Sequence, residues 1–298
     1  MNATAQIEYE SRVRVRYGVL AFAAALLLVG AQLFGLVGPS SSIDETTLGL
    51  VIANKRAGLD LGEAFTYFFG MLSLLLLLTW LFRISRARNP GMKQWTLWLS
   101  ASGTALGGVM YLAYIIVLTT KAHTFVTTGN QGYPEAYALT NTGLVRVLPL
   151  LWQLGALLLA VGSIWTSLNA MRVGLITRMV GYIGVICGAM FIFQLPVLTP
   201  IVQGYWLAAV AITLAGRWPS GDPPAWAAGE AVVWPSGASV PGPREQRSRS
   251  TRAQRRRVST QEVLAAVEPK NENGAGGVGT NSTPSPSTSA SKRKRKRK

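Results

Sequence analysis

Long apolar runs fill the first 218 residues of the chain, and polar residues dominate the rest. A bilayer core is about 30 Å thick, so a membrane-spanning helix needs about 20 mostly apolar residues. A lipid-exposed segment must also satisfy its own backbone hydrogen bonds, which favours helices. The pattern therefore predicts six transmembrane helices, at about Tyr17–Val37, Ala64–Phe82, Thr96–Thr119, Leu144–Leu168, Leu175–Leu195 and Leu198–Gly216.

Basic residues are divided unevenly between the connections of these helices. One side carries nine Lys or Arg, in the N-terminal arm and in the second and fourth connections, and the other side carries three. Because Lys and Arg in short loops favour the cytoplasmic side, we expect both termini in the cytoplasm. The connections Gly38–Glu63 and Thr120–Gly143 are then outside, and Pro196 and Pro200 form a tight hairpin that stops the last two helices.

Three regions follow from this pattern: an N-terminal arm (1–16), a helix bundle (17–218) and a cytoplasmic tail (219–298). The tail begins with Pro-rich segments that carry Trp226 and Trp234. Since Trp favours the headgroup zone, we expect these segments along the membrane surface. Ser259-Thr-Gln-Glu262 has the form of a capping box and predicts a short helix through Val267. Gly, Ser, Thr, Pro and Asn predominate from Lys270 onward, which indicates disorder.

The tail is strongly basic. The formal net charge is +16, and the residues after 216 hold 16 Lys or Arg against 6 Asp or Glu. A basic tail beside an anionic inner leaflet gains about 1 kcal/mol per Lys or Arg near the surface, so anionic lipids are the expected partner. A cytoplasmic protein, a ribosome or nucleic acid is the alternative, and so is a solubilising extension without a partner. The residues expected to contact lipid or a partner are Arg255, Arg256, Arg257, Lys292, Arg293, Lys294, Arg295, Lys296, Arg297 and Lys298.

Charged residues are confined to the ends of the predicted spans. Glu63 and Arg146 lie at outer ends, and Gln153, two helical turns after Arg146, shares its face. We expect these residues to pair with one another or to bind a ligand at the outer surface. Three more residues are expected to contribute to a modest polar cavity: Gln32, Gln194 and Gln203.

Two patterns of small residues occur within predicted helices, Gly103-Thr-Ala-Leu-Gly107 and Gly184-Val-Ile-Cys-Gly188. Small residues four positions apart let helices approach closely. A six-helix bundle has more internal than external interfaces, so we expect packing within the chain rather than dimerisation.

Several motifs resemble catalytic, metal-binding or cofactor-binding patterns, but they lack the neighbouring residues or secondary structure that these functions require. Ala101-Ser-Gly103 resembles the Ser-Gly element of rhomboid-type intramembrane proteases, but such a serine needs a base, and His123 lies beyond the end of the same predicted helix. His123 also has no second ligand at metal-binding spacing. Gly274-Ala-Gly-Gly-Val-Gly279 has the dinucleotide-binding form but lies in a linker, not between a strand and a helix. We expect no enzymatic activity, no cofactor and no metal.

The segments that frame the last two predicted helices carry a resemblance. They are Asn169-Ala-Met-Arg-Val-Gly-Leu-Ile-Thr-Arg178, Arg217-Trp-Pro-Ser-Gly-Asp-Pro-Pro-Ala-Trp226, Gly229-Glu-Ala and Trp234-Pro-Ser236. Here the chain resembles a family of six-helix bacterial membrane proteins of unknown function that end in a basic cytoplasmic tail. The resemblance implies a compact bundle in the bacterial plasma membrane and transfers no functional residues. The terminal Lys/Arg run is similar to the tails of some membrane insertases that contact ribosomes.

The sequence thus predicts an all-α polytopic membrane protein with six transmembrane helices, both termini inside and a disordered C-terminal tail. The leading functional hypothesis is a non-enzymatic scaffold, or a sensory or regulatory component whose tail contacts the inner leaflet or a cytoplasmic partner. The alternative is a small-molecule carrier or ligand-binding protein with a polar cavity near Glu63, Arg146 and Gln153. A continuous polar cavity would favour the alternative.

Overall fold

A computed structural model describes residues 3–36, 46–193, 195, 198–219 and 221–232 of the chain. The chain divides into two units, Met1–Ser236 and Gly237–Lys298, and every described residue belongs to the first. The regular elements of the described residues are all helices. They are α1 (Ala3–Leu36), α2 (Thr46–Arg88), α3 (Trp95–Thr127), α4 (Tyr133–Asn141), α5 (Leu144–Arg172), α6 (Arg178–Phe193), α7 (Leu198–Leu214) and α8 (Pro224–Ala228).

Four of these helices are long and apolar enough to cross a membrane: α1, α2, α3 and α5. The other two that the sequence predicts as spans, α6 and α7, are apolar but only 16 and 17 residues long. The described part of the chain is therefore a helical protein suited to a membrane.

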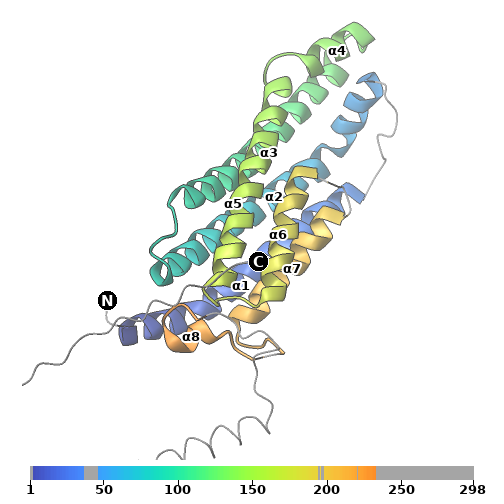
Figure 1. Ribbon diagram of the computed structural model, residues 1–298. Coiled ribbons are helices and arrows are strands. Elements are labelled where there is room, and N and C mark those ends of the chain that lie inside the picture. Colours follow the sequence, from blue (N-terminus) through green and yellow to red (C-terminus); the bar gives the residue numbers. More distant parts are fainter. Residues whose placement is uncertain (1–2, 37–45, 194, 196–197, 220, 233–298) are drawn as a thin grey trace, which may run out of the picture. The chain divides into compact units, whose positions relative to one another are not determined.

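Six helices, α1, α2, α3, α5, α6 and α7, are longer than α4 and α8, and we call them the six long helices. They form a closed ring. α1 packs against α2, α2 against α3, α3 against α5, α5 against α6, α6 against α7, and α7 returns to α1 (Figure 1). The short α4 joins the end of α3 to the start of α5, and α8 lies at the opposite end of α5. The ring brings the first and last long helices of the bundle into contact.

Small residues line the inner face of α1, and large apolar residues line its outer face. Ala21, Ala24 and Ala31 are fully buried. Exposed positions at helical spacing are Val15, Val19, Phe22, Leu26 and Leu33. In water such exposure would be costly, whereas lipid tails are as apolar as these side chains. The outer surface of α1 is therefore suited to contact with lipid.

The predicted glycine pattern of α3 lies at its contact with α5. A methyl group added at Gly155 would come within 2.6 Å of the Gly107 backbone nitrogen, and one added at Gly103 would collide with the backbone at Leu159. Gly184 and Gly188 of α6 likewise face side chains of α5. Both patterns therefore lie at packing contacts within the chain: Gly103, Gly184 and Gly188 leave no room for a Cβ atom, and Gly107 has room for one but lies against Gly155.

Two connections differ from the sequence prediction. The expected outer loop Gly38–Glu63 is helical from Thr46 onward, so that α2 runs for 43 residues. At about 1.5 Å per residue it is about 65 Å long, roughly twice the bilayer core. The connection Thr120–Gly143 contains the last turns of α3 and all of α4.

The prediction that Pro200 stops a helix is wrong. Pro200 is the third residue of α7 and is buried. The first backbone N–H groups of a helix have no partner within it, so proline is tolerated in the first turn. Pro200 therefore belongs to the start of α7.

Several predictions fall outside the described residues. They concern Gln194, Pro196, Trp234, the arginine run Arg255–Arg257, the capping-box helix after Ser259, the glycine run 274–279 and the terminal basic run Lys292–Lys298.

Candidate functional site

A polar cavity of ≈ 250 Å³ lies inside the helix ring. Each of the six long helices contributes to its wall. The lining residues are Gln32 of α1, Glu63 and Tyr67 of α2, Tyr111 of α3, Trp152 and Ala156 of α5, Phe191 of α6, Thr199, Pro200 and Gln203 of α7, and Leu195 in the connection between α6 and α7. The cavity therefore exists because the ring closes.

Glu63 is half-buried and is the one charged residue in this lining. The Tyr111 hydroxyl donates a hydrogen bond to Glu63 Oε1 at 2.6 Å. The other carboxylate oxygen, Oε2, faces Gly35 near the end of α1. The carboxylate thus retains acceptor capacity for a bound group.

Three aromatic side chains stand next to Glu63. The ring centroids of Tyr67 and Tyr111 are 4.9 Å apart in an edge-to-face arrangement, and those of Tyr111 and Trp152 are 5.1 Å apart. Tyr67 and Trp152 both line the cavity with Tyr111. These contacts join α2, α3 and α5 into one aromatic wall.

A second carboxylate lies one helical turn before Glu63. Arg56 Nε is 3.3 Å from Asp60 Oδ1, and Arg56 Nη2 donates to the Phe34 carbonyl at 3.2 Å. Both side chains of this pair are mostly buried. Arg56 therefore neutralises Asp60 and links α2 to α1 through the Phe34 carbonyl.

The structure brings together only part of the predicted ligand site. Glu63 lines the cavity, and so do Gln32 and Gln203 as expected. Arg146 is exposed, and Gln153 is half-buried but outside this lining. The predicted pairing of Glu63 with Arg146 is replaced by the Tyr111 hydrogen bond. Arg146 lies on the outward side of α5, next to buried Val145.

Sequence reasoning missed Tyr67, Tyr111 and Trp152. Successive helical residues are about 100° apart, so Trp152 can face the cavity while Gln153 does not. The sequence did contain a signal for Tyr111 and Trp152, because small residues mark the inward faces of α3 and α5. Trp152 precedes Ala156 by four positions, and Tyr111 follows Gly107 by four. Extending the small-residue stripes by one turn finds both aromatic side chains.

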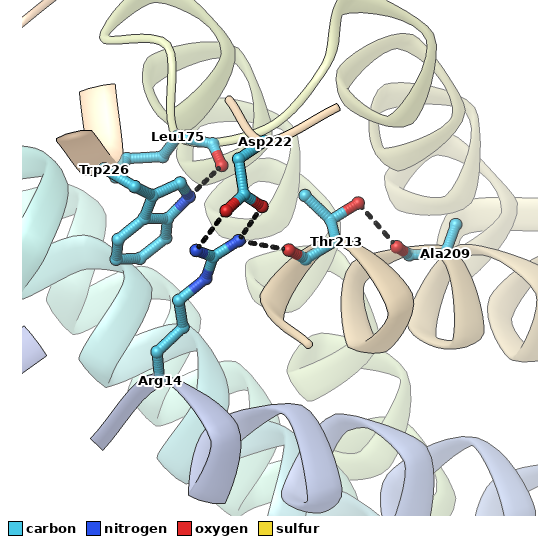
Figure 2. Close-up of polar contacts among 6 residues, drawn as sticks. All are labelled: Arg14, Leu175, Ala209, Thr213, Asp222 and Trp226. Carbon is cyan, nitrogen blue, oxygen red and sulfur yellow. Dashed lines mark hydrogen bonds and ion pairs between the residues drawn. The ribbon is translucent and has the colours of Figure 1, made fainter. Parts of the chain in front are cut away.

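A second polar cluster lies at the other end of the ring, around Trp226 of α8 (Figure 2). Trp226 is 7% exposed, and its indole N–H donates to the Leu175 carbonyl at 3.0 Å. Arg14 lies over the indole at 4.7 Å from the ring centroid and binds Asp222 at 2.8 Å. Arg14 Nη2 also donates to the Thr213 carbonyl at 2.6 Å. We call these residues, with Glu10 and Arg88, the α8 cluster.

A buried ion pair completes the α8 cluster. Arg88 Nη2 lies 2.5 Å from Glu10 Oε2, and the Arg88 side chain has no exposed surface. Arg88 also donates to the Ala225 carbonyl at 3.1 Å and lies 5.4 Å from the Trp226 ring centroid. The indole therefore has a guanidinium near it from α1 and another from α2.

Trp226, which the sequence predicts along the membrane surface, packs into the helix bundle. Trp226 is buried in protein because two arginines and a backbone carbonyl satisfy its face and its N–H.

The chain after α8 also returns to the bundle, since Val232 N–H donates to the Val173 carbonyl at 3.3 Å. At the adjacent Gly174, φ is +78°, and a Cβ would collide with Val232. Position 174 therefore requires glycine, because of both the positive φ and the close approach of Val232.

Comparisons of the chain with protein-family models, with curated proteins and with solved structures found no match.

Proposed function

We propose that this protein crosses the membrane six times and binds a small polar molecule in the cavity inside the helix ring, as a carrier or receptor rather than as an enzyme. α6 and α7 are about 24 and 26 Å long at about 1.5 Å per residue, which is short for a core of about 30 Å. Local thinning of the bilayer accommodates such a mismatch at modest cost. Both helices close the ring of longer helices, which supports a full crossing.

In this proposal both termini are cytoplasmic, and the membrane is the bacterial plasma membrane. The nine-to-three division of Lys and Arg supports this orientation. The α8 cluster then lies at the inner end of the ring. The lining includes Gln32 near the end of α1 and Thr199 at the start of α7, which supports a position of the cavity toward the outer leaflet.

The observation that carries the proposal is the cavity itself. Its lining combines one carboxylate, two amides and four aromatic rings in an otherwise apolar bundle. Ligand sites have this composition, with an apolar and aromatic wall and a few convergent polar groups.

The scaffold hypothesis remains the second candidate, and the α8 cluster favours it. Asp222 and Trp226 fasten the chain to the bundle just before the basic tail begins. In this reading the bundle is an anchor, and Arg255–Arg257 with Lys292–Lys298 contact anionic lipid or a cytoplasmic partner. Nothing in this reading requires the cavity.

Native mass spectrometry of the full chain released from its own membranes tests both candidates. We expect a discrete small molecule bound to the wild-type protein. Ala156→Leu, which adds three carbons to the cavity wall, should remove it. Leu157→Ala is the matched control, because Leu157 is the next residue of α5 and is 41% exposed. A lipid or protein adduct that disappears when Lys292–Lys298 is changed to glutamine, with no cavity-dependent adduct, would instead support the scaffold.

A further inference from the structure

The charge of the cavity restricts its ligand. Glu63 is the one charged residue of the described lining, and Tyr111 supplies it with a neutral hydrogen bond. The basic group that acts electrostatically on Glu63 is Arg56, which is paired with Asp60. When Glu63 is ionised, Glu63, Arg56 and Asp60 together carry one net negative charge.

The aromatic wall also favours a cationic ligand. The faces of Tyr and Trp rings are electron-rich and attract cations within about 6 Å, most strongly where water is excluded. Tyr67, Tyr111 and Trp152 form a continuous wall beside the carboxylate. Gln32 and Gln203 add amide groups, whose carbonyl oxygens accept N–H or O–H donors.

The cavity volume of ≈ 250 Å³ gives room for a small ligand. This suits a compact molecule with a few carbon atoms. A divalent metal ion is served poorly, because it takes about six to eight oxygen ligands and much of this wall is aromatic or apolar.

We infer that the cavity binds a compact organic ammonium ion, with its positive charge at Glu63 and its alkyl groups against Tyr67, Tyr111 and Trp152. The inference rests on the proposed function and names the class of its ligand. The carboxylate supplies the counter-charge, the rings replace the hydration of the alkyl groups, and the amides orient a polar substituent.

The test is isothermal titration calorimetry of the full chain in lipid nanodiscs with three probes of one shape. Choline is cationic, 3,3-dimethylbutan-1-ol is its neutral isostere, and 3,3-dimethylbutanoate is an anion of similar size. We expect choline to bind about tenfold or more tighter than the neutral isostere, and the anion not to bind. Sodium and potassium chloride, titrated alone, show whether the site takes inorganic cations.

Variants locate the binding. Glu63→Gln should weaken choline binding about tenfold or more and leave choline no better than the neutral isostere. Glu8→Gln is the matched control, because Glu8 is an exposed carboxylate outside the cavity lining. Trp152→Phe should retain choline binding within a few-fold, since a ring remains, and Trp152→Leu should lose it. Circular dichroism of each variant shows whether the bundle is intact.

The outcomes separate the ligand class from the proposed function. If the neutral isostere binds as well as choline and Trp152→Leu abolishes both, the cavity binds ligands but the cationic class is wrong. The class is also wrong if the anion is preferred, or if sodium or potassium binds and choline does not. If none of the probes binds and no cavity-dependent adduct is found by native mass spectrometry, the proposed function fails as well.

Discussion

At the scale of single residues, two largely buried arginines in the described part of the chain each have an acidic partner. Arg88 is fully buried in the α8 cluster and has Glu10 and the Ala225 carbonyl as acceptors. Arg56 likewise has two acceptors, Asp60 and the Phe34 carbonyl. Glu63 differs, because its side-chain partner is the neutral Tyr111. That difference makes Glu63 the residue of interest for binding.

The Glu10–Arg88 pair should contribute strongly to the folded state. Glu10→Gln leaves the Arg88 guanidinium buried without a counter-charge, which should destabilise the protein by about 3–5 kcal/mol. Arg88→Met should do the same, and the double variant should lose less than the two single losses combined. Thermal unfolding of the detergent-solubilised full chain, followed by circular dichroism, measures this. Glu8→Gln on the exposed face is the control, and an equal shift for Glu10→Gln and Glu8→Gln would contradict the prediction.

At the scale of elements, small residues decide which helices touch. α3 and α5 approach so closely that neither Gly103 nor Gly155 has room for a Cβ atom. This contact sets the rotation of both helices about their axes. Because Tyr111 and Trp152 lie on these two helices, the same rotation turns their rings toward the cavity.

Gly155→Ala should therefore separate α3 from α5. Its new methyl group would come within 2.6 Å of the Gly107 nitrogen, and such overpacking costs about 1–3 kcal/mol. Gly30→Ala in α1 is the matched control, because a methyl group there meets nothing within 4 Å. The control should be neutral or stabilising by up to about 1 kcal/mol, since Ala favours helices over Gly. Melting temperatures of the two purified variants decide the matter, and equal effects would show that the contact is not tight.

At the scale of the whole molecule, the ring gives its two ends different character. The α8 end holds ion pairs and arginine–indole contacts that fasten α1, α2 and α8 together. The other end holds the cavity and the connection between α6 and α7. If α6 and α7 cross the membrane, this connection and α4 are on the same side.

Cysteine accessibility tests that arrangement. Cys187, the one cysteine of the chain, is buried and is replaced by alanine to give a background without thiols. In intact cells a membrane-impermeant maleimide should label Tyr137→Cys in α4 and Leu195→Cys, because both sites are exposed and the proposed topology puts them outside. Gln94→Cys, between α2 and α3, should react only after permeabilisation. Labelling of Leu195→Cys only after permeabilisation would mean that α6 and α7 do not cross.

The sequence determined which stretches form the apolar parts of the six long helices, because hydropathy depends on local composition and length, but it did not indicate the first turns of α2 or the short α4. Only the tertiary structure decided which residues meet. The rotation of α5 placed Trp152 rather than Gln153 at the cavity, and contacts across four segments buried Trp226 instead of leaving it at the surface. The cavity itself is lined by all six long helices, so no segment read alone indicates it. Hydropathy records how apolar a helix is, whereas a site depends on which face each helix turns toward its neighbours.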